Sequence, residues 1–312
     1  TNTLLEILSK EKPSHIAVVF DMEGPTTRHV EFEAYKANRE EMPEDLRKSI
    51  PYIIELIKGF NIEVLGISGY EADDLIGTLA LKAEKAGFTT YMMTPDKDYG
   101  QLVDANTFIY KPARLGNGAE IMGPAEVCKK WDIRNVSELI DILGLMGDKV
   151  DNIPGIPGVG EKTAIQLIKD FGSIENLLAN TDKLKGKLKE KVENNRDMAI
   201  QSKRLATIII DSPIELEEEK LAIKAPNKEA LVELFKELEF RRLAQNLFGE
   251  ELPEKPAANA KTAAPDLFSD VGDTSSNNEE LPEEVVTVYK TINDVPHNYV
   301  VADSEQTIAQ LL

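Results

Sequence analysis

The stretch IEVLGISGYEADDLIGTLALKAEKAGFTTYMMTPDKD, residues 62–98, alternates between apolar runs and a helical pattern. The runs at 62–67 and 88–94 predict two strands, and the periodicity between them predicts a helix over 71–86 that ends before Gly87. This alternation is typical of a mostly parallel sheet with helices on both faces. Acidic residues follow both predicted strands, and their clustering has to be explained.

The same kind of patterning extends through the first part of the chain. Residues 14–21 predict a buried strand, 43–59 a helix and 107–122 a short hairpin. Beyond them, 124–248 show only helical patterns. We therefore predict an α/β core at 1–123, with a mostly parallel sheet flanked by helices, followed by an all-helical region at 124–250.

The last part of the chain has a different composition. Residues 251–284 hold nine acids, two lysines and few large apolar groups, which is typical of a flexible linker. Strand and helix signals resume at 285–312, where we expect the start of a further domain.

Composition narrows the class of protein. The 312 residues are 42% hydrophobic, enough for a substantial core, and no apolar run approaches the roughly 18 residues that a membrane span needs. The single cysteine, Cys128, is expected to be a buried thiol rather than a nucleophile. We expect a monomeric cytoplasmic protein.

The net charge of −19 disfavours a nucleic-acid partner. However, residues 182–204 carry eight Lys or Arg against four acids and predict a local basic surface.

Eight carboxylates fall where parallel strands and a later turn would bring them together. In open α/β sheets, ligands bind beyond the carboxyl ends of the strands. Oxygen ligands without interleaved His or Cys suit Mg²⁺ or Mn²⁺, and two such ions can drive phosphodiester hydrolysis. The alternative is a helix N-cap with a solvated first turn. We predict a two-ion site, with one pair on the same side of a helical turn, formed by Asp21, Glu71, Asp73, Asp74, Asp96, Asp98, Asp148 and Asp151.

A glycine-rich turn lies ahead of an amphipathic helix in IPGIPGVGEKTAIQLIKDFGS, residues 153–173. Its exposed backbone amides and the helix N-terminus would bind a phosphate without reading bases. An ordinary glycine-rich turn is the alternative, and a nucleoside triphosphate loop is disfavoured because the GxxxxGK[ST] spacing is absent. We predict contacts to the DNA backbone from Gly155, Gly158, Gly160, Lys162 and Thr163.

Basic and aromatic residues are interleaved in TRHVEFEAYKANREEMP, residues 27–43. On a helix, Lys36 and Arg39 would share a face and could stabilise charge on a phosphate, while Arg28 and Tyr35 would contact DNA. A solvated amphipathic helix is the alternative interpretation. We predict Lys36 and Arg39 to be catalytic residues.

The motifs VVFD, YKANR, GYEADDLIG, TPDKDYGQL and GDKVDNIPGIPGVGEKTA resemble the 5′ nuclease domains of bacterial DNA polymerases, a branch of the flap endonuclease family. The resemblance covers residues 1–248. It implies a PIN-like fold, a helical arch over a metal site built from the eight acids, and a helix-hairpin-helix that grips duplex DNA and binds K⁺. It also implies cleavage of 5′ flaps and RNA primers in replication and repair.

A second resemblance, one departure from the family pattern and two competing functions have to be considered. The stretch NYVVADSEQTIAQLL, residues 298–312, is similar to the start of a proofreading 3′-5′ exonuclease domain. The family's first strand, which supplies a further carboxylate, would precede the first residue of this chain, so we expect residues 1–312 alone to bind metal weakly and cleave little. A DNA-binding module with catalytically idle carboxylates and a phosphatase-type α/β hydrolase remain the alternatives.

Overall fold

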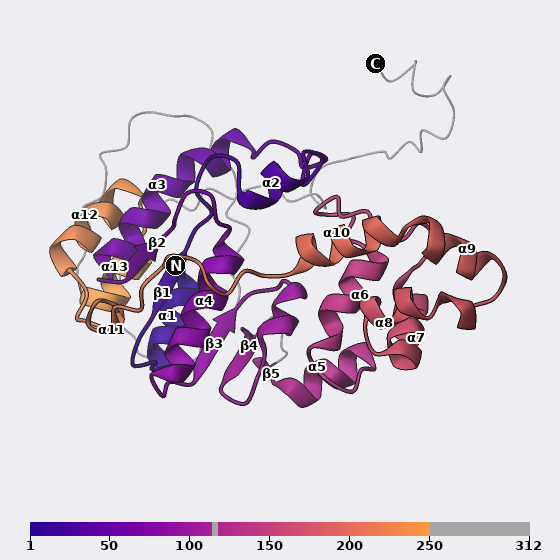
Figure 1. Ribbon diagram of the computed structural model, residues 1–312. Helices are drawn as coiled ribbons and strands as arrows, with labels where there is room; N and C mark the ends of the chain where they lie inside the picture. Colours follow the sequence, from indigo (N-terminus) through magenta and orange to yellow (C-terminus); the bar gives the residue numbers. More distant parts are fainter. Residues whose placement is uncertain (114–117, 250–312) are drawn as a thin grey trace, which may run out of the picture. The chain divides into compact units, whose positions relative to one another are not determined.

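The computed structural model describes residues 1–113 and 118–249 (Figure 1). The predicted linker and the exonuclease-like segment lie outside the described residues. The first elements in chain order are α1 (Asn2–Glu6), η1 (Ile7–Glu11), β1 (Ala17–Val19), α2 (Thr27–Glu31), α3 (Glu44–Gly59), β2 (Glu63–Leu65), α4 (Ala72–Lys85), β3 (Thr90–Met93), η2 (Asp98–Leu102), β4 (Thr107–Lys111) and β5 (Glu120–Met122). Helices follow: α5 (Pro124–Trp131), α6 (Glu138–Met146), α7 (Glu161–Phe171), α8 (Ile174–Ala179), η3 (Thr181–Lys183), α9 (Gly186–Asn194), α10 (Arg196–Ala206), α11 (Glu218–Leu221), α12 (Lys228–Glu237) and α13 (Arg241–Phe248).

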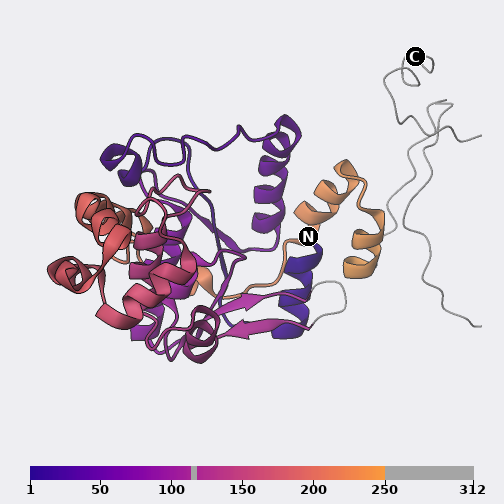
Figure 2. The same cartoon turned by 90° about the vertical axis from the view of Figure 1, so that its right-hand side faces the viewer.

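The strands form two small sheets. β1 pairs with β2 in parallel, β3 pairs with β4 in parallel, and β4 and β5 form the antiparallel hairpin that the sequence predicts. The α/β class and the mostly parallel pairing are therefore confirmed. In the described part of the chain, β1 and β3 belong to different sheets, and α4 contacts both strands. The hairpin lies beside the N-terminal helices (Figure 2), where the Tyr110 hydroxyl donates to Glu11 at 2.9 Å.

Helix α4 shows how local sequence fixes the site's central element. Asp73 and Asp74 lie in its first turn and Lys82 and Lys85 near its last, so both ends complement the helix dipole. Gly87 ends it with φ of +88°, while the amides of residues 87 and 88 donate to the carbonyls of residues 84 and 83. This is a Schellman motif, which favours glycine. The predicted helix over 71–86 is confirmed.

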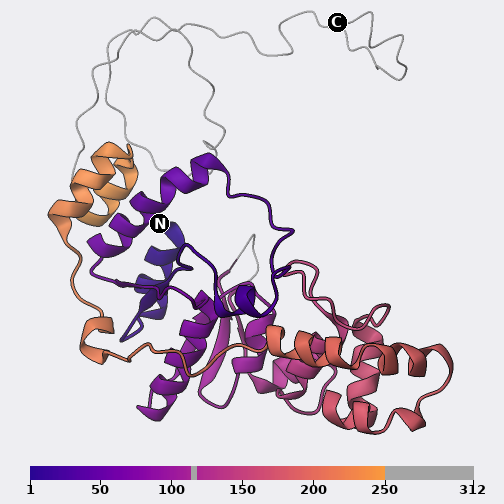
Figure 3. The same cartoon turned by 45° about the horizontal axis from the view of Figure 1, so that its top comes forward.

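Segments from opposite ends of the described chain share a core. Leu56 and Ile57 of α3 pack with Leu231 and Phe235 of α12, so the last helices lie against α3 (Figures 1 and 3). A larger core joins the inner face of β3–β5 to α5–α10, where α6 is buried between α7 and α10. Among the described residues, no helix is long and apolar enough to cross a membrane.

Two local predictions are wrong. The helix expected within 27–43 ends at Glu31, and Lys36 adopts a left-handed conformation with φ of +55°. Asp148 and Asp151 lie in a loop rather than on a helical turn, because α6 ends at Met146 and Asp148 exchanges backbone hydrogen bonds with Ile153. Tertiary contacts fix both segments: the Lys36 amide donates to the Asp151 carbonyl at 2.9 Å.

Candidate metal centre

Glu71, at the start of α4, joins the segment after α2 to the loop after α6. Its side chain is almost fully buried and accepts hydrogen bonds from the Tyr35 hydroxyl at 3.0 Å and the Lys36 ammonium at 2.8 Å. The same two groups lie 3.3 Å and 3.7 Å from Asp151 Oδ2. The structure therefore brings together Glu71 and Asp151, which are 80 positions apart in the sequence.

Lys36 and Arg39 meet at Asp151, although they do not share a helical face. Arg39 donates to Asp151 Oδ1 at 2.5 Å, while the Lys36 ammonium lies over the Tyr35 ring, 4.9 Å from its centroid. Tyr35 is buried, with 3% of its surface exposed, which leaves little of its ring for a base to stack on. Lys36 and Arg39 thus both lie beside the carboxylate of Asp151, and their catalytic role stays a prediction.

Asp73 and Asp98 each carry a buried carboxylate oxygen that lacks a hydrogen-bond partner. Burial, reinforced by nearby Asp74 and Glu71 against the opposing charge of Arg28, raises the pKa of Asp73 to about 7. Burial also raises the pKa of Asp98 to about 7, with repulsion from Asp96 adding to the effect. A carboxylate in such surroundings is stabilised by a cation.

Lys97, which the sequence analysis did not single out, neutralises Asp148. Its ammonium lies 2.8 Å from Asp148 Oδ2, and the Val150 amide donates to Asp148 Oδ1 at 2.7 Å. Burial opposes ionisation, yet these two hydrogen bonds lower the pKa of Asp148 below its ordinary value. Neighbouring Asp96 is exposed and accepts the Asp98 amide at 2.9 Å.

Tyr99 is a second residue that sequence reasoning missed. It is buried, and its phenol pKa is raised by burial and then by the charges of Asp73, Asp96, Asp21 and Asp74. Acids that follow β1, β2 and β3 therefore all act electrostatically on the same phenol. Asp21 itself is exposed and caps α4 by accepting the Ala72 amide at 2.7 Å. Tyr99 directly follows Asp98 in the motif TPDKDYGQL, and an aromatic residue next to these acids could have indicated this role.

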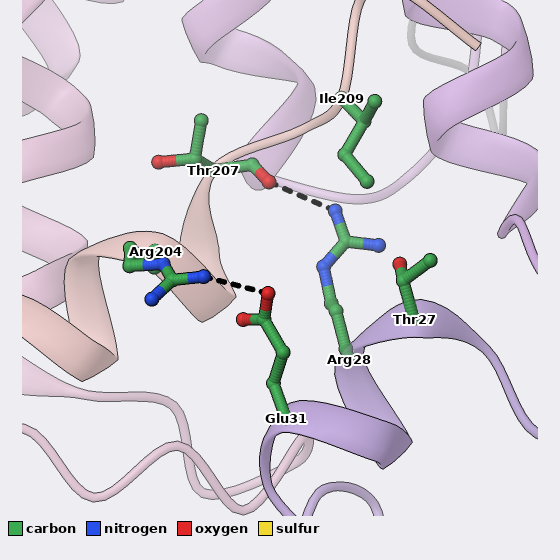
Figure 4. Close-up of a pocket in the computed structure, with 6 residues that line it drawn as sticks. All are labelled: Thr27, Arg28, Glu31, Arg204, Thr207 and Ile209. Carbon is green, nitrogen blue, oxygen red and sulfur yellow. Dashed lines mark hydrogen bonds and ion pairs between the residues drawn. The ribbon is translucent and has the colours of Figure 1, made fainter.

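Arg28 and Asp74 are buried together beneath this surface. Arg28 is 4% exposed and Asp74 is fully buried; the guanidinium binds the carboxylate through two hydrogen bonds, of 2.8 Å and 2.7 Å. Arg28 also donates to the backbone carbonyls of Leu205 and Thr207. A pocket of about 260 Å³ lies beside it, lined by residues of α2 and of the chain around the end of α10 (Figure 4).

The donor chemistry of the site fits Mg²⁺ or Mn²⁺. The acids offer only oxygen ligands, and two buried oxygens have no partner. Within residues 1–113 and 118–249, no three carboxylate, imidazole or thiol groups are grouped closely enough to hold an ion. Several acids instead contact Lys36, Arg39 or Lys97.

The glycine-rich turn precedes α7 as predicted. Gly155 is buried against Gly147, whereas Gly158, Gly160 and Lys162 are exposed and Thr163 is half-buried. Gly160 is the N-cap of α7, so the helix begins at an exposed surface. The Lys191 ammonium of α9 lies 3.2 Å from the Gly158 carbonyl oxygen, which places the basic segment beside the turn.

The fold and the site define an α/β protein whose acidic strand ends adjoin a helical region with an exposed glycine-rich turn. Residues 1–132 match the family model of the 5′-3′ exonuclease N-terminal resolvase-like domain, and residues 135–229 match that of the 5′-3′ exonuclease C-terminal SAM fold. The chain belongs to the 5′-3′ exonuclease family.

Relatives and solved structures agree with this assignment. DNA polymerase I of Bacillus subtilis is 42% identical over 275 residues, which covers 86% of this chain and 31% of that protein. DNA polymerase I of Geobacillus stearothermophilus is 37% identical over 300 residues, covering 96% and 33%. The chain thus spans about a third of the length of these curated relatives. The bacteriophage T5 5′-exonuclease has the same fold, with a TM-score of 0.57 at 17% identity over 77% of this chain and 88% of that one.

Proposed function

We propose that this chain is the 5′ nuclease part of a DNA polymerase I and hydrolyses phosphodiester bonds at 5′ flaps and RNA primers during replication and repair. The observation that carries the proposal is that acids from distant segments meet at shared lysines and at neighbouring positions: Glu71 and Asp151 at Lys36, and Asp148 at Lys97. In addition, Asp73 and Asp98 each have a buried oxygen without a hydrogen-bond partner. Catalysis would depend on two Mg²⁺ or Mn²⁺ ions. The protein would act as a cytoplasmic monomer.

Seven of the eight acids, all except the fully buried Asp74, are proposed to hold these ions. When bound, the ions would supply Lewis acidity and charge neutralisation at the phosphate. Lys36 and Arg39 would bind and orient the phosphate oxygens, because both are cationic and contact ligand carboxylates. Tyr35 would hold Glu71 and Asp151 in place through its hydroxyl. The proposed ligands are Asp21, Glu71, Asp73, Asp96, Asp98, Asp148 and Asp151.

DNA is the proposed partner. A flap endonuclease of bacteriophage T5 that shares the fold has been solved with DNA and metal ions, with a TM-score of 0.57. In this chain, the exposed turn at Gly158 and Gly160, with Lys162 and Thr163 after it, would bind backbone phosphates through amides and charge. Carbonyls of the same turn, which begins at Gly155, would bind K⁺.

A cleavage assay on a 5′-flap duplex tests the proposal, using this chain and, where the natural protein is longer, the full-length protein. We expect the full-length protein to cleave the flap in Mg²⁺ and EDTA to abolish this cleavage, whereas residues 1–312 alone should cleave little. Asp96→Ala should bind the duplex but cleave it at least about 100-fold more slowly. Glu55→Gln, an exposed acid on α3, is the matched control and should cleave normally.

Two outcomes would overturn the nuclease assignment. Duplex that stays bound and intact with Mg²⁺ and with Mn²⁺ would identify a DNA-binding module with idle carboxylates. Turnover of small phosphate esters without DNA cleavage would identify a phosphatase-type hydrolase.

A further inference from the structure

Asp74 has no free coordination site in this structure. Its Oδ1 accepts hydrogen bonds from Arg28 at 2.7 Å and from the Ile209 amide at 2.8 Å. Its Oδ2 accepts from Arg28 at 2.8 Å and from the Glu71 amide at 3.2 Å. A carboxylate has about four lone-pair sites. All four are therefore occupied by protein donors, and the residue is fully buried.

Arg28 is equally saturated. Besides its two bonds to Asp74, it donates to the Leu205 carbonyl at 3.0 Å, the Thr207 carbonyl at 2.8 Å and Glu71 Oε2 at 3.4 Å. A guanidinium has five N–H donors, and each has an acceptor here. With 4% of its surface exposed, Arg28 offers little surface and no free donor to DNA.

The pair joins three distant segments at one point. Arg28 belongs to α2, Asp74 to α4, and residues 205–209 form the path by which the chain leaves α10 and returns to the α/β core. An exposed ion pair of 2.7 Å between Glu31 and Arg204 crosses the same junction, and Figure 4 shows it beside the Arg28–Thr207 hydrogen bond. The junction thus links the helical region to the first turn of α4.

We propose that Arg28 and Asp74 form a buried clamp that positions Glu71 and Asp73, and that Asp74 is not itself a metal ligand. The clamp fixes Glu71 directly, since Asp74 accepts a hydrogen bond from its amide and Arg28 donates one to its carboxylate. Arg28 also forms an ion pair of 4.0 Å with Asp73. The clamp also fixes the position of α10, and with it that of the proposed DNA-binding region, relative to the carboxylates. This inference rests on the proposed nuclease function, because it assigns roles within that site.

Mn²⁺ titration followed by electron paramagnetic resonance of the free ion separates a clamp from a ligand. We expect Asp74→Asn to bind as many Mn²⁺ ions as the wild type, with affinity within about threefold, while its Tm falls by roughly 10 °C because Arg28 loses a charged partner. Asp96→Asn, the matched control from the exposed proposed ligands, should bind Mn²⁺ at least about 10-fold more weakly with little change in Tm. Loss of an ion by Asp74→Asn at an unchanged Tm would overturn the clamp.

Two further variants keep the test decisive. If Asp74→Asn does not fold, the double variant Arg28→Met with Asp74→Leu removes both buried charges at similar volume, which proteins commonly tolerate. Retention of the wild-type number of Mn²⁺ ions by this variant supports the clamp, and loss of an ion refutes it.

Arg28→Lys should lower kcat for flap cleavage about 10- to 100-fold per folded molecule while KM for DNA stays within about threefold. An unchanged kcat per folded molecule would reduce the pair to a purely structural contact and overturn the positioning role.

The results for the wild-type protein distinguish a failure of the proposed nuclease function from a failure of the clamp. A wild type that binds no Mn²⁺ and cleaves no flap refutes the proposed function and the clamp with it. A wild type that binds and cleaves, beside an Asp74→Asn variant that behaves like Asp96→Asn, refutes the clamp alone.

Discussion

Raising the pH from 5.5 to 7.5 in EDTA should destabilise the metal-free protein. Burial raises the pKa of both Asp73 and Asp98 from 3.8 to about 7 in the folded state. A group whose folded pKa exceeds its unfolded value binds a proton more tightly when folded, so its contribution to stability is complete below the unfolded pKa and is lost as the pH rises through the folded one. The expected window of loss therefore runs from about pH 4 to pH 7.

The magnitude follows from the slope of 1.36 kcal/mol per pH unit and proton. From pH 5.5 to 7 this sets an upper limit of about 2 kcal/mol for each group. The Asp73 side chain is 25% exposed, and solvent screening reduces the effect to roughly 1 kcal/mol each. Two groups then lower the free energy of unfolding by about 2 kcal/mol, which corresponds to a fall in Tm of about 4–8 °C.

Thermal unfolding in EDTA, measured for the wild type and for the double variant Asp73→Asn with Asp98→Asn, isolates this contribution. Every other titratable group is common to the two proteins, so its effect cancels in the difference between them. Mn²⁺ should raise the wild-type Tm more at pH 7.5 than at pH 5.5, since the ion competes with protons for the same oxygens. Equal pH slopes for the two proteins in EDTA would show that these carboxylates are already ionised and solvated, and the reasoning would fail.

Three further predictions concern other parts of the molecule. Lys36→Met should lower kcat for flap cleavage about 100-fold or more, whereas Lys48→Met, which removes an exposed lysine paired with Glu44 on α3, should leave kcat unchanged. Equal rates for the two variants would exclude Lys36 from the reaction. Gly147→Ala should cost about 2–4 kcal/mol in urea unfolding, because φ is +69° and an added Cβ would collide with the Ile153 carbonyl. Gly172→Ala, also at positive φ but in open space, should cost only about 1 kcal/mol, and similar losses would contradict the packing argument. Lys187→Gln, an exposed lysine of α9, should reduce the slope of log K for duplex binding against log salt by about 1, and an unchanged slope would remove it from the phosphate contacts.

Periodicity predicted the regular elements well where local and tertiary preferences agree. The helix expected over 43–59 is observed at Glu44–Gly59. The expectation that acids beyond the strand ends share one metal site stays a prediction. The prediction of a helix throughout 27–43 is wrong because the composition of the segment favours a helix, whereas contacts with the loop after α6 impose a turn. The Asn152 side-chain amide, for example, donates to the Ala34 carbonyl at 2.6 Å, across 118 positions. Propensity carries no information on such a contact.

The roles of basic residues were the least accessible to sequence reasoning. Arg28 and Arg39 occur in the same short segment with similar neighbours, yet Arg28 is buried and Arg39 is about half exposed. The difference arises from the chain around the end of α10, whose Leu205 and Thr207 carbonyls lie 177 and 179 positions from Arg28. Lys97 was missed for a similar reason, since its partner Asp148 comes from another segment.

The acids fall into two groups according to what neutralises them. Asp74, Glu71, Asp148 and Asp151 are paired with arginine or lysine side chains of the same chain. Asp73 and Asp98 each retain a buried oxygen without a hydrogen-bond partner, although Asp73 Oδ1 lies 4.0 Å from the Arg28 guanidinium, and the pKa of each carboxyl is about 7. The second group would hold a divalent cation without the displacement of a lysine ammonium, and the cation would relieve the repulsion among these carboxylates. The charge of the bound metal ion would then weaken the ion pairs of Glu71 and Asp151 with Lys36 and Arg39. The side chains of Lys36 and Arg39 would thereby become available to bind a phosphate of the substrate.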